Sequence, residues 1–344
     1  MKPGRFFPIS VLILSVLLVW DARAQAATLE QLIEGAKKEG TLEFYAPSYL
    51  SPQGAQALGD AFNKTYGLNI TVKYSPAGNM ARDVGKVVGT AAAGAPPEWD
   101  VMALTDAHHA TLALRKLHQA IDYKTLGIDP KIIHYGNGSI SIANEFVLPA
   151  YNYKALPAKD VPKGWEDLLD PKWKGGKLGV STATHHLSRL AAGPWGEEKT
   201  TRYVRALAQQ GLLLGTLGEI YSRLQLGEIL AAVTLVDGFI HRAKVAGAPI
   251  VHAEGIEPLI SPALHAGVLN GARHPNAGHL ISVFLTTLRA QEIWENFGGQ
   301  SSAFIPGTKA YKYAQGKHVL HMSDKDAEFV DRLARDYGQI LGFK

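Results

Sequence analysis

A unit made of a short apolar strand, a turn of small hydroxyl residues and a helix recurs along this chain, and it indicates a fold of the α/β class. Its clearest copy runs from the strand 177–180 through the turn 181–184 into a helical pattern that begins with His185 and His186. The first N–H groups of a helix have no partner within the helix. Because these groups would lie beyond the end of the strand, they predict a site for an anion or another polar group.

Three units of the same kind follow one another in the first half of the chain. Strands are expected over 41–45, 70–74 and 100–104, and each is followed by a polar turn and a helical pattern. Such alternation predicts a parallel sheet with right-handed crossovers, which bring the three turns to one edge of the sheet. Ligands of open α/β sheets bind beyond the carboxyl ends of the strands. These turns are therefore candidate binding loops.

Two long extended segments, 140–152 and 264–269, interrupt the alternation, and a complete series of strands and helices lies between them. We therefore expect a two-lobed fold in which each lobe is a mainly parallel sheet flanked by helices. The second lobe is predicted over 150–263, inserted into the first. The first lobe is predicted to be discontinuous, formed by 25–149 and 264–344, and the two crossings are predicted to act as a hinge.

The N-terminal segment predicts export. Lys2 and Arg5 precede an apolar run over 6–20, and a small-x-small pattern ends at Ala24. This is the pattern of a signal peptide over 1–24, cleaved near Ala24. A membrane anchor is the alternative, but about 15 apolar residues are fewer than the roughly 20 that a spanning helix needs. We expect a periplasmic protein.

Composition excludes several classes of function. The chain has no cysteine, so disulfides and thiol catalysis are excluded, and a metal would need histidine, tyrosine or carboxylate ligands. No block of lysines and arginines is present, which argues against nucleic acid as a partner. The sequence patterns of serine hydrolases, zincins and P-loop nucleotide-binding proteins are also absent. We predict no enzyme and no cofactor, with an exported lyase or transferase as the alternative.

The candidate ligand contacts are polar side chains at predicted strand ends in both lobes. They are Ser48, Tyr49, Asn79, Thr105 and Asp106 in the first lobe, Tyr151 in an extended segment, and Ser181, Thr182, Thr184, His185 and Asp237 in the second lobe. The acid at 237 could accept a hydrogen bond from an ammonium or a hydroxyl group of a ligand. Helix capping or ordinary turn formation explains most of these residues without a ligand, so both interpretations stay open.

Two histidine doublets, 108–109 and 185–186, lie near predicted strand ends. Adjacent residues on a helix point in different directions, so each doublet is expected to offer at most one ligand to a single point. A metal held by one imidazole from each lobe is therefore an alternative and not the main prediction.

Three motifs carry a resemblance to a known family. They are Gly-Trp-Glu-Asp-Leu-Leu-Asp-Pro-Lys-Trp-Lys-Gly at 164–175, Leu-Gln-Leu-Gly-Glu at 224–228 and His-Pro-Asn-Ala-Gly-His-Leu at 274–280. With these three motifs in this order, the chain resembles bacterial type 2 periplasmic solute-binding proteins of ABC importers. The branch that it resembles includes ferric-iron, thiamine, polyamine and phosphonate binders. The resemblance implies a hinged receptor, which we expect to be a monomer, that delivers a small polar solute to an inner-membrane ABC permease. A receptor that feeds a sensor is the alternative.

The resemblance leaves the solute undetermined. In the iron-binding members of that family, two adjacent tyrosines of the second lobe hold the metal. The corresponding stretch of this chain, 234–241, contains no tyrosine. Binding of ferric iron through phenolates is therefore not implied, although binding of iron or of a metal chelate stays as an alternative.

Overall fold

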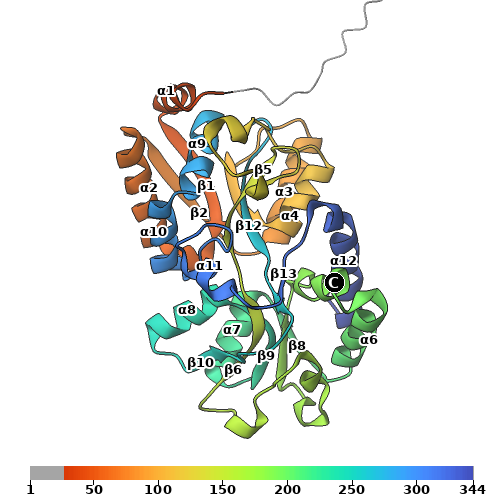
Figure 1. Ribbon diagram of the computed structural model, residues 1–344. Helices are drawn as coiled ribbons and strands as arrows, with labels where there is room; N and C mark the ends of the chain where they lie inside the picture. Colours follow the sequence, from red (N-terminus) through yellow and green to blue (C-terminus); the bar gives the residue numbers. More distant parts are fainter. Residues whose placement is uncertain (1–26, 344) are drawn as a thin grey trace, which may run out of the picture.

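The computed structural model of this chain describes residues 27–343 (Figure 1). The predicted signal peptide, 1–24, lies outside the described residues. Within the described range, every helix is too short or too polar to cross a lipid bilayer. The described chain forms two lobes, each built on a sheet that is flanked by helices, as the sequence predicts.

The first lobe contains a six-stranded sheet in the order β2-β1-β3-β12-β5-β4. The parallel pairing of β1 with β2 and β3 confirms the three predicted strand and helix units. However, β12 runs antiparallel to both β3 and β5, and β4 is antiparallel to β5, so this sheet is mixed and not mainly parallel as predicted. The strands are β1 (Thr41–Pro47), β2 (Thr71–Ala77), β3 (Val101–Thr105), β4 (Ile133–His134), β5 (Ser139–Asn144) and β12 (Ala263–Val268).

The helices of this lobe begin and end where capping residues occur. Thr28 forms a capping box at the start of α1, and the left-handed Gly40 ends that helix. Asn79, predicted as a ligand contact or a turn residue, caps α3 through its side-chain oxygen. The helices that flank the sheet are α1 (Leu29–Glu39), α2 (Ser51–Tyr66), α3 (Met80–Ala92), α4 (Asp106–Leu114), α9 (Pro275–Leu285) and α10 (Leu288–Gly298).

The second lobe contains a sheet in the order β13-β11-β6-β9-β7-β8, and β10 pairs with β6. The strand β7 is parallel to β8 and β9, whereas β6 is antiparallel to β9. The strands are β6 (Val147–Asn152), β7 (Leu178–Ser181), β8 (Leu213–Gly215), β9 (Ala231–Val236), β10 (Ile250–His252), β11 (Leu259–Ile260) and β13 (Val319–Leu320). The flanking helices are α5 (His185–Ala192), α6 (Gly196–Ala208), α7 (Leu217–Leu226) and α8 (Asp237–Ala246).

The chain crosses between the two sheets at the segments that the sequence marks as extended. The predicted extended segment 140–152 is two strands, β5 in the first sheet and β6 in the second, and Glu145 and Phe146 lie between them. The second crossing joins β11 of the second sheet to β12 of the first. Both crossings are short, which suits a hinge between two rigid lobes.

The C-terminal part of the chain differs from the prediction that 264–344 belongs to the first lobe. After α11 (Lys309–Ala314), β13 pairs with β11 in the second sheet. The last helix, α12 (Ala327–Leu341), packs against α4 of the first lobe and against α5 and α6 of the second (Figure 1). The range 264–344 therefore contacts both lobes, because the amphipathic α12 buries its apolar face against helices of each.

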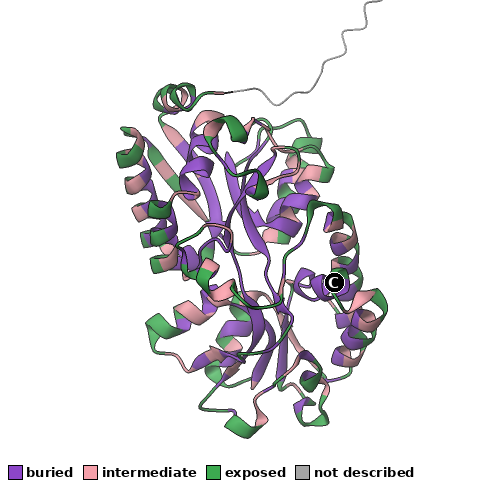
Figure 2. Cartoon of the chain, in the orientation of Figure 1, coloured by how far each residue is buried: buried purple, intermediate pink, exposed green. Residues whose placement is uncertain are grey.

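The core of each lobe lies between the sheet and its helices (Figure 2). Every residue of β5, β9 and β12 is buried, as expected for central strands that are covered on both faces. The two tryptophans of the motif at 164–175 are also buried, and the indole of Trp165 donates to the carbonyl of Pro258 at 3.1 Å. This motif therefore packs the second lobe and takes no part in the cavity described below.

Candidate functional site

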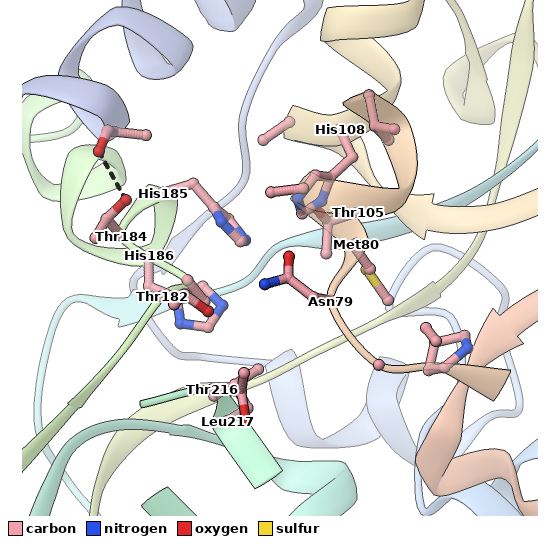
Figure 3. Close-up of a pocket in the computed structure, with 18 of the residues that line it drawn as sticks. Asn79, Met80, Thr105, His108, Thr182, Thr184, His185, His186, Thr216 and Leu217 are labelled. Carbon is pink, nitrogen blue, oxygen red and sulfur yellow. Dashed lines mark hydrogen bonds between the residues drawn. The ribbon is translucent and has the colours of Figure 1, made fainter. Parts of the chain in front are cut away.

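A cavity of about 730 Å³ lies between the two lobes. Its walls come from the loops after β1, β2 and β3 in the first lobe and from the turns after β7 and β8 in the second, with α12 along one side. These loops follow the carboxyl ends of parallel strands, which is where ligands of open α/β sheets bind. Apolar and polar side chains both line the cavity, and many of the polar ones lie where helices begin (Figure 3).

The structure brings seven of the eleven predicted site residues to this cavity. They are Ser48, Tyr49, Asn79, Thr105, Thr182, Thr184 and His185. Their contact with a ligand stays a prediction. The other four, Asp106, Tyr151, Ser181 and Asp237, do not line it.

Several of the lining polar groups already have protein partners. The Oδ1 atom of Asn79 accepts from the backbone N–H of Arg82 at 3.0 Å, so this residue caps α3 and leaves only its NH₂ group to face the cavity. The hydroxyl of Thr184 donates to the carbonyl of Ala334 at 2.7 Å, which ties α5 to α12 (Figure 3). The hydroxyl of Thr105 bonds Nδ1 of His108 at 2.7 Å.

Asp106 is buried in an ion pair and does not face the cavity. Its carboxylate pairs with the guanidinium of Arg189, which belongs to α5 of the other lobe. It also accepts from the N–H groups of Ala107 at 2.7 Å and Ala263 at 3.3 Å. Burial raises the pKa of Asp106, and the charge of Arg189 opposes that rise. Asp106 therefore does not line the cavity as predicted, and instead it links the two lobes through its ion pair with Arg189.

The remaining predicted residues are also accounted for by the fold. Ser181 ends β7, is buried, and accepts from the N–H of Ala183 at 3.3 Å. Tyr151 lies in the middle of β6, where it pairs with β9 and β10. Asp237 is the first residue of α8 and accepts from Nε2 of Gln300 at 2.8 Å. It lines a second cavity, of about 270 Å³, on the other side of Phe146.

Two further histidines line the main cavity, His108 and His186, which the sequence analysis named as members of the doublets but not as ligand contacts. The rings of His108 and His185 lie 5.2 Å apart across the lobes, and those of His185 and His186 lie 4.5 Å apart. Both members of the 185–186 doublet line the cavity, because they occupy the first turn of α5, where the chain turns out of the strand. The expectation that each doublet offers at most one ligand to a single point stays a prediction, since lining one cavity does not bring both rings to one point.

These imidazoles are uncharged near neutral pH. Burial lowers the pKa of His108 to about 4. Burial also lowers the pKa of His185 and His186 well below the usual value, and the charge of Arg189 lowers both further. Neutral imidazoles can bind metals, although among residues 27–343 no three histidine, aspartate or glutamate side chains are close enough together to hold one ion. In their neutral form the rings can both donate and accept hydrogen bonds.

A buried acidic cluster lies beside the cavity at the hinge, and it involves Glu145, which sequence reasoning also missed. The hydroxyl of Tyr49 donates to Oε1 of Glu145 at 2.6 Å. Burial raises the pKa of Glu145 to about 7 and that of Asp237 to about 8. Gln300 contacts Asp237 from the C-terminal part of the chain. The cluster thus joins side chains from both lobes and from a crossing segment.

Comparison with known proteins gives one family and a consistent fold. Residues 57–250 match the family described as "bacterial extracellular solute-binding protein". Among curated proteins, none matches the chain.

Solved structures with the same fold come from proteins with different ligands. Iron-bound HitA from Pseudomonas aeruginosa is 18% identical, with a TM-score of 0.68 over 87% of this chain and 99% of that one. AfuA from Actinobacillus pleuropneumoniae with fructose-6-phosphate is 19% identical, with a TM-score of 0.70 over 89% and 99%. The Atu4243–GABA receptor structure is 15% identical, with a TM-score of 0.67 over 88% and 98%. At these identities the likeness concerns the fold alone.

Proposed function

The chain belongs to the family of bacterial extracellular solute-binding proteins, and from this premise we propose that it captures a small polar solute between its lobes and delivers it to an inner-membrane ABC permease. The cavity between the lobes is the observation that carries this proposal. It has about the volume that a small organic molecule needs, and residues of both lobes line it. A solute held there would contact both lobes at once.

Capture would work by a shift between open and closed arrangements of the lobes. Two short crossings and the longer connection from α10 to β13 join the lobes, and we expect the lobes to rotate about them as rigid bodies, as in other hinged binding proteins. A solute favours the closed form only to the extent that it binds that form better than the open one. Contacts with Thr105 and His108 on one side and with Thr182 and His185 on the other would be made together only in the closed form.

The proposal also covers the cellular location of the protein, its oligomeric state and the release of the solute without chemical change. We place the protein in the periplasm as a monomer, with the signal peptide removed near Ala24. Family and fold are those of substrate-binding proteins and not of enzymes. We therefore expect the solute to be released unchanged.

Binding of ferric iron or a metal chelate is the alternative with structural support, since iron-bound HitA has the same fold. Two observations weigh against it in this chain. The stretch 234–241 has no tyrosine, and no three histidine, aspartate or glutamate side chains of the described residues come together as a metal site. A receptor that feeds a sensor has the same binding step, so only the partner protein would distinguish it.

A solute screen tests the proposal. The purified protein would be heated with metals, amines, amino acids, sugar phosphates and organic acids. A ligand at 100 times its Kd stabilises the folded state by about 2.7 kcal/mol, which raises the Tm by several degrees. A hit should change the intrinsic fluorescence to saturation and be recovered chemically unchanged. Consumption of the compound, or no shift from any class, would contradict the proposal.

A further inference from the structure

On the basis of the proposed function, we propose that the solute is an organic monoanion, whose carboxylate binds at the start of α5 with His185 and His186 and whose apolar body lies against the apolar wall of the cavity. This assignment names the class of solute, which the family leaves open. Three observations support it. They are the free N–H groups at the start of α5, the buried histidine nitrogens without a hydrogen-bond partner, and the charges of the side chains that line the cavity.

The helices that begin at the cavity differ in their caps. Asn79 caps α3 and Thr216 caps α7, each through a side-chain oxygen. In α4, the carboxylate of Asp106 accepts from the N–H of Ala107. No side chain caps α5. The N–H groups of Thr184 and His185 donate to no acceptor among the described residues. These groups, with the partial positive charge of the helix start, favour an anion.

Unpartnered nitrogens in the same place supply the second observation. His186 is fully buried, and neither of its ring nitrogens has a partner in the described structure. Nε2 of His185, a residue that is 8% exposed, also has none. Both side chains line the cavity, and Figure 3 shows them pointing to the same part of it as Asn79. Buried polar atoms without partners are costly, so a bound group that completes their hydrogen bonds would be favoured.

The charges of the lining favour an anion over a cation. Among the described lining residues, the acids are Glu145, which accepts from Tyr49, and Asp331, which pairs with Arg335. Each carboxylate thus already has a partner, which makes it a weaker site for an ammonium group. Arg115 and Arg242 also line the cavity.

A single negative charge fits better than two. The imidazoles at the start of α5 are neutral, and the nearby Arg189 is already neutralised by Asp106. A helix start contributes only about half a positive charge. At the start of α5 these groups match a carboxylate, whereas a phosphate dianion would need the exposed Arg115 or Arg242 to compensate its second charge.

The rest of the cavity predicts the body of the solute. Apolar side chains line the cavity from both lobes, Met80 and Val84 from the first and Leu217 and Phe239 from the second, and together they are its apolar wall. A ligand that exposed only polar groups there would lose hydrogen bonds with water and gain none. An acid with a hydrocarbon or aromatic body would instead bury apolar surface on this wall.

Four probes of similar shape and different charge test the inference by calorimetric titration of the purified protein. They are 3-phenylpropanoate, its neutral amide 3-phenylpropanamide, 2-phenylethylammonium and phenyl phosphate. We expect the carboxylate to bind at least roughly tenfold more tightly than each of the others, because it alone supplies a charged acceptor of the right valence. The inference is overturned if the amide, the ammonium or the phosphate binds as tightly as the carboxylate, or if none binds. A solute of another class found in the wider screen would still leave the proposed function standing.

Substitution of His186 separates a binding role from a structural one. We expect His186→Leu to weaken binding of 3-phenylpropanoate by roughly 10- to 100-fold. It should leave the Tm of the ligand-free protein unchanged or raised, since the imidazole nitrogens have no partners to lose. His186→Asn, which keeps a donor, should restore part of the affinity, and His318→Ala at an exposed site is the control. Unchanged affinity in His186→Leu would overturn the assignment, as would a lowered Tm with parallel loss of all four probes.

Discussion

Helices α4 and α8 begin with an aspartate, whereas α5 begins with two histidines, and this difference separates structural helix starts from the one that we assign to binding. Helices α4 and α8 follow a strand directly and α5 follows β7 after a three-residue turn, so their local sequences predict the same kind of site. Asp106 and Asp237 bring their own carboxylates to the first turn and are buried away from the main cavity. At α5 the donors are left open. A helix start is thus available to a ligand only when the protein supplies no acceptor of its own.

The two aspartates also differ from each other. Asp106 pairs with Arg189, whereas Asp237 has only Gln300 as a side-chain partner, and its pKa rises to about 8 because it is buried. One is therefore a charged link between lobes, and the other is a neutral acid below about pH 8. Both could be exposed to water if the lobes moved apart.

The largest expected effect comes from breaking the charged link. Asp106→Asn leaves the guanidinium of Arg189 buried without a counter-charge, which should lower the free energy of unfolding by about 3 to 5 kcal/mol. Urea denaturation measures the change. The control is Glu98→Gln, whose pair with Lys86 is more than half exposed, with side-chain exposures of 53% and 56%; we expect a loss of at most about 1 kcal/mol there.

A double substitution sharpens this prediction. Replacing both partners, as Asp106→Leu with Arg189→Met, removes the buried charges together and should recover much of the lost stability. If the single and the double variants were equally destabilised, the carboxylate would matter for the N–H groups of Ala107 and Ala263 and not for its charge partner.

The second effect concerns pH and the neutral acid. The folded-state pKa of Asp237, about 8, lies above that of an unfolded aspartate, so the folded state holds a proton that the unfolded state releases. The stabilisation from this proton is complete below about pH 4 and is lost as the pH rises toward 8. Asp237→Asn should remove this dependence. The difference in unfolding free energy between wild type and variant should change by about 1.4 kcal/mol per pH unit between about pH 5 and pH 7.

The control for this measurement is Asp60→Asn, which alters an exposed carboxylate on α2. Its stability should follow that of the wild type across the same pH range. If Asp237→Asn also followed the wild type, the acid would be charged in the folded protein, and the distinction between the two aspartates would disappear.

A smaller effect is expected where α5 joins α12. Thr184→Val removes the hydrogen bond from the threonine hydroxyl to the carbonyl of Ala334, at 2.7 Å, and should cost about 1 kcal/mol of unfolding free energy. Thr65→Val removes a bond of the same length, to the carbonyl of Ala61, at an exposed site, and should cost no more than about 0.5 kcal/mol. Equal costs would mean that α12 does not hold the start of α5 in place.

The sequence predicted the two-lobed fold and the loops of the cavity because both follow from local pattern. Strand ends, the Asn79 cap and the crossings can be located from a few neighbouring residues. The hydrogen-bond or ion-pair partner of each polar side chain could not be predicted, because that partner is distant in sequence. Asp106 and Arg189 are separated by 83 positions, and Gln300 approaches Asp237 from 63 positions away. The lack of any partner for His186 is likewise a property of the folded surroundings and not of the sequence nearby.

The smallest expected effect compares two neighbours at the end of β7. Ser181 is buried and accepts from the N–H of Ala183 at 3.3 Å, whereas Thr182 lines the cavity. Ser181→Ala should lower the unfolding free energy by about 0.5 kcal/mol and leave the Kd for 3-phenylpropanoate unchanged. Thr182→Ala should do the reverse, raising that Kd about two- to fivefold with the Tm unchanged, because an exposed hydroxyl contributes little to folding but can bond a bound carboxylate. Calorimetric titration and thermal melts of both variants measure this exchange of roles. If instead Ser181→Ala weakened binding and Thr182→Ala did not, the carboxylate would bind deeper, at the end of the strand, and the open N–H groups of α5 would not be its site.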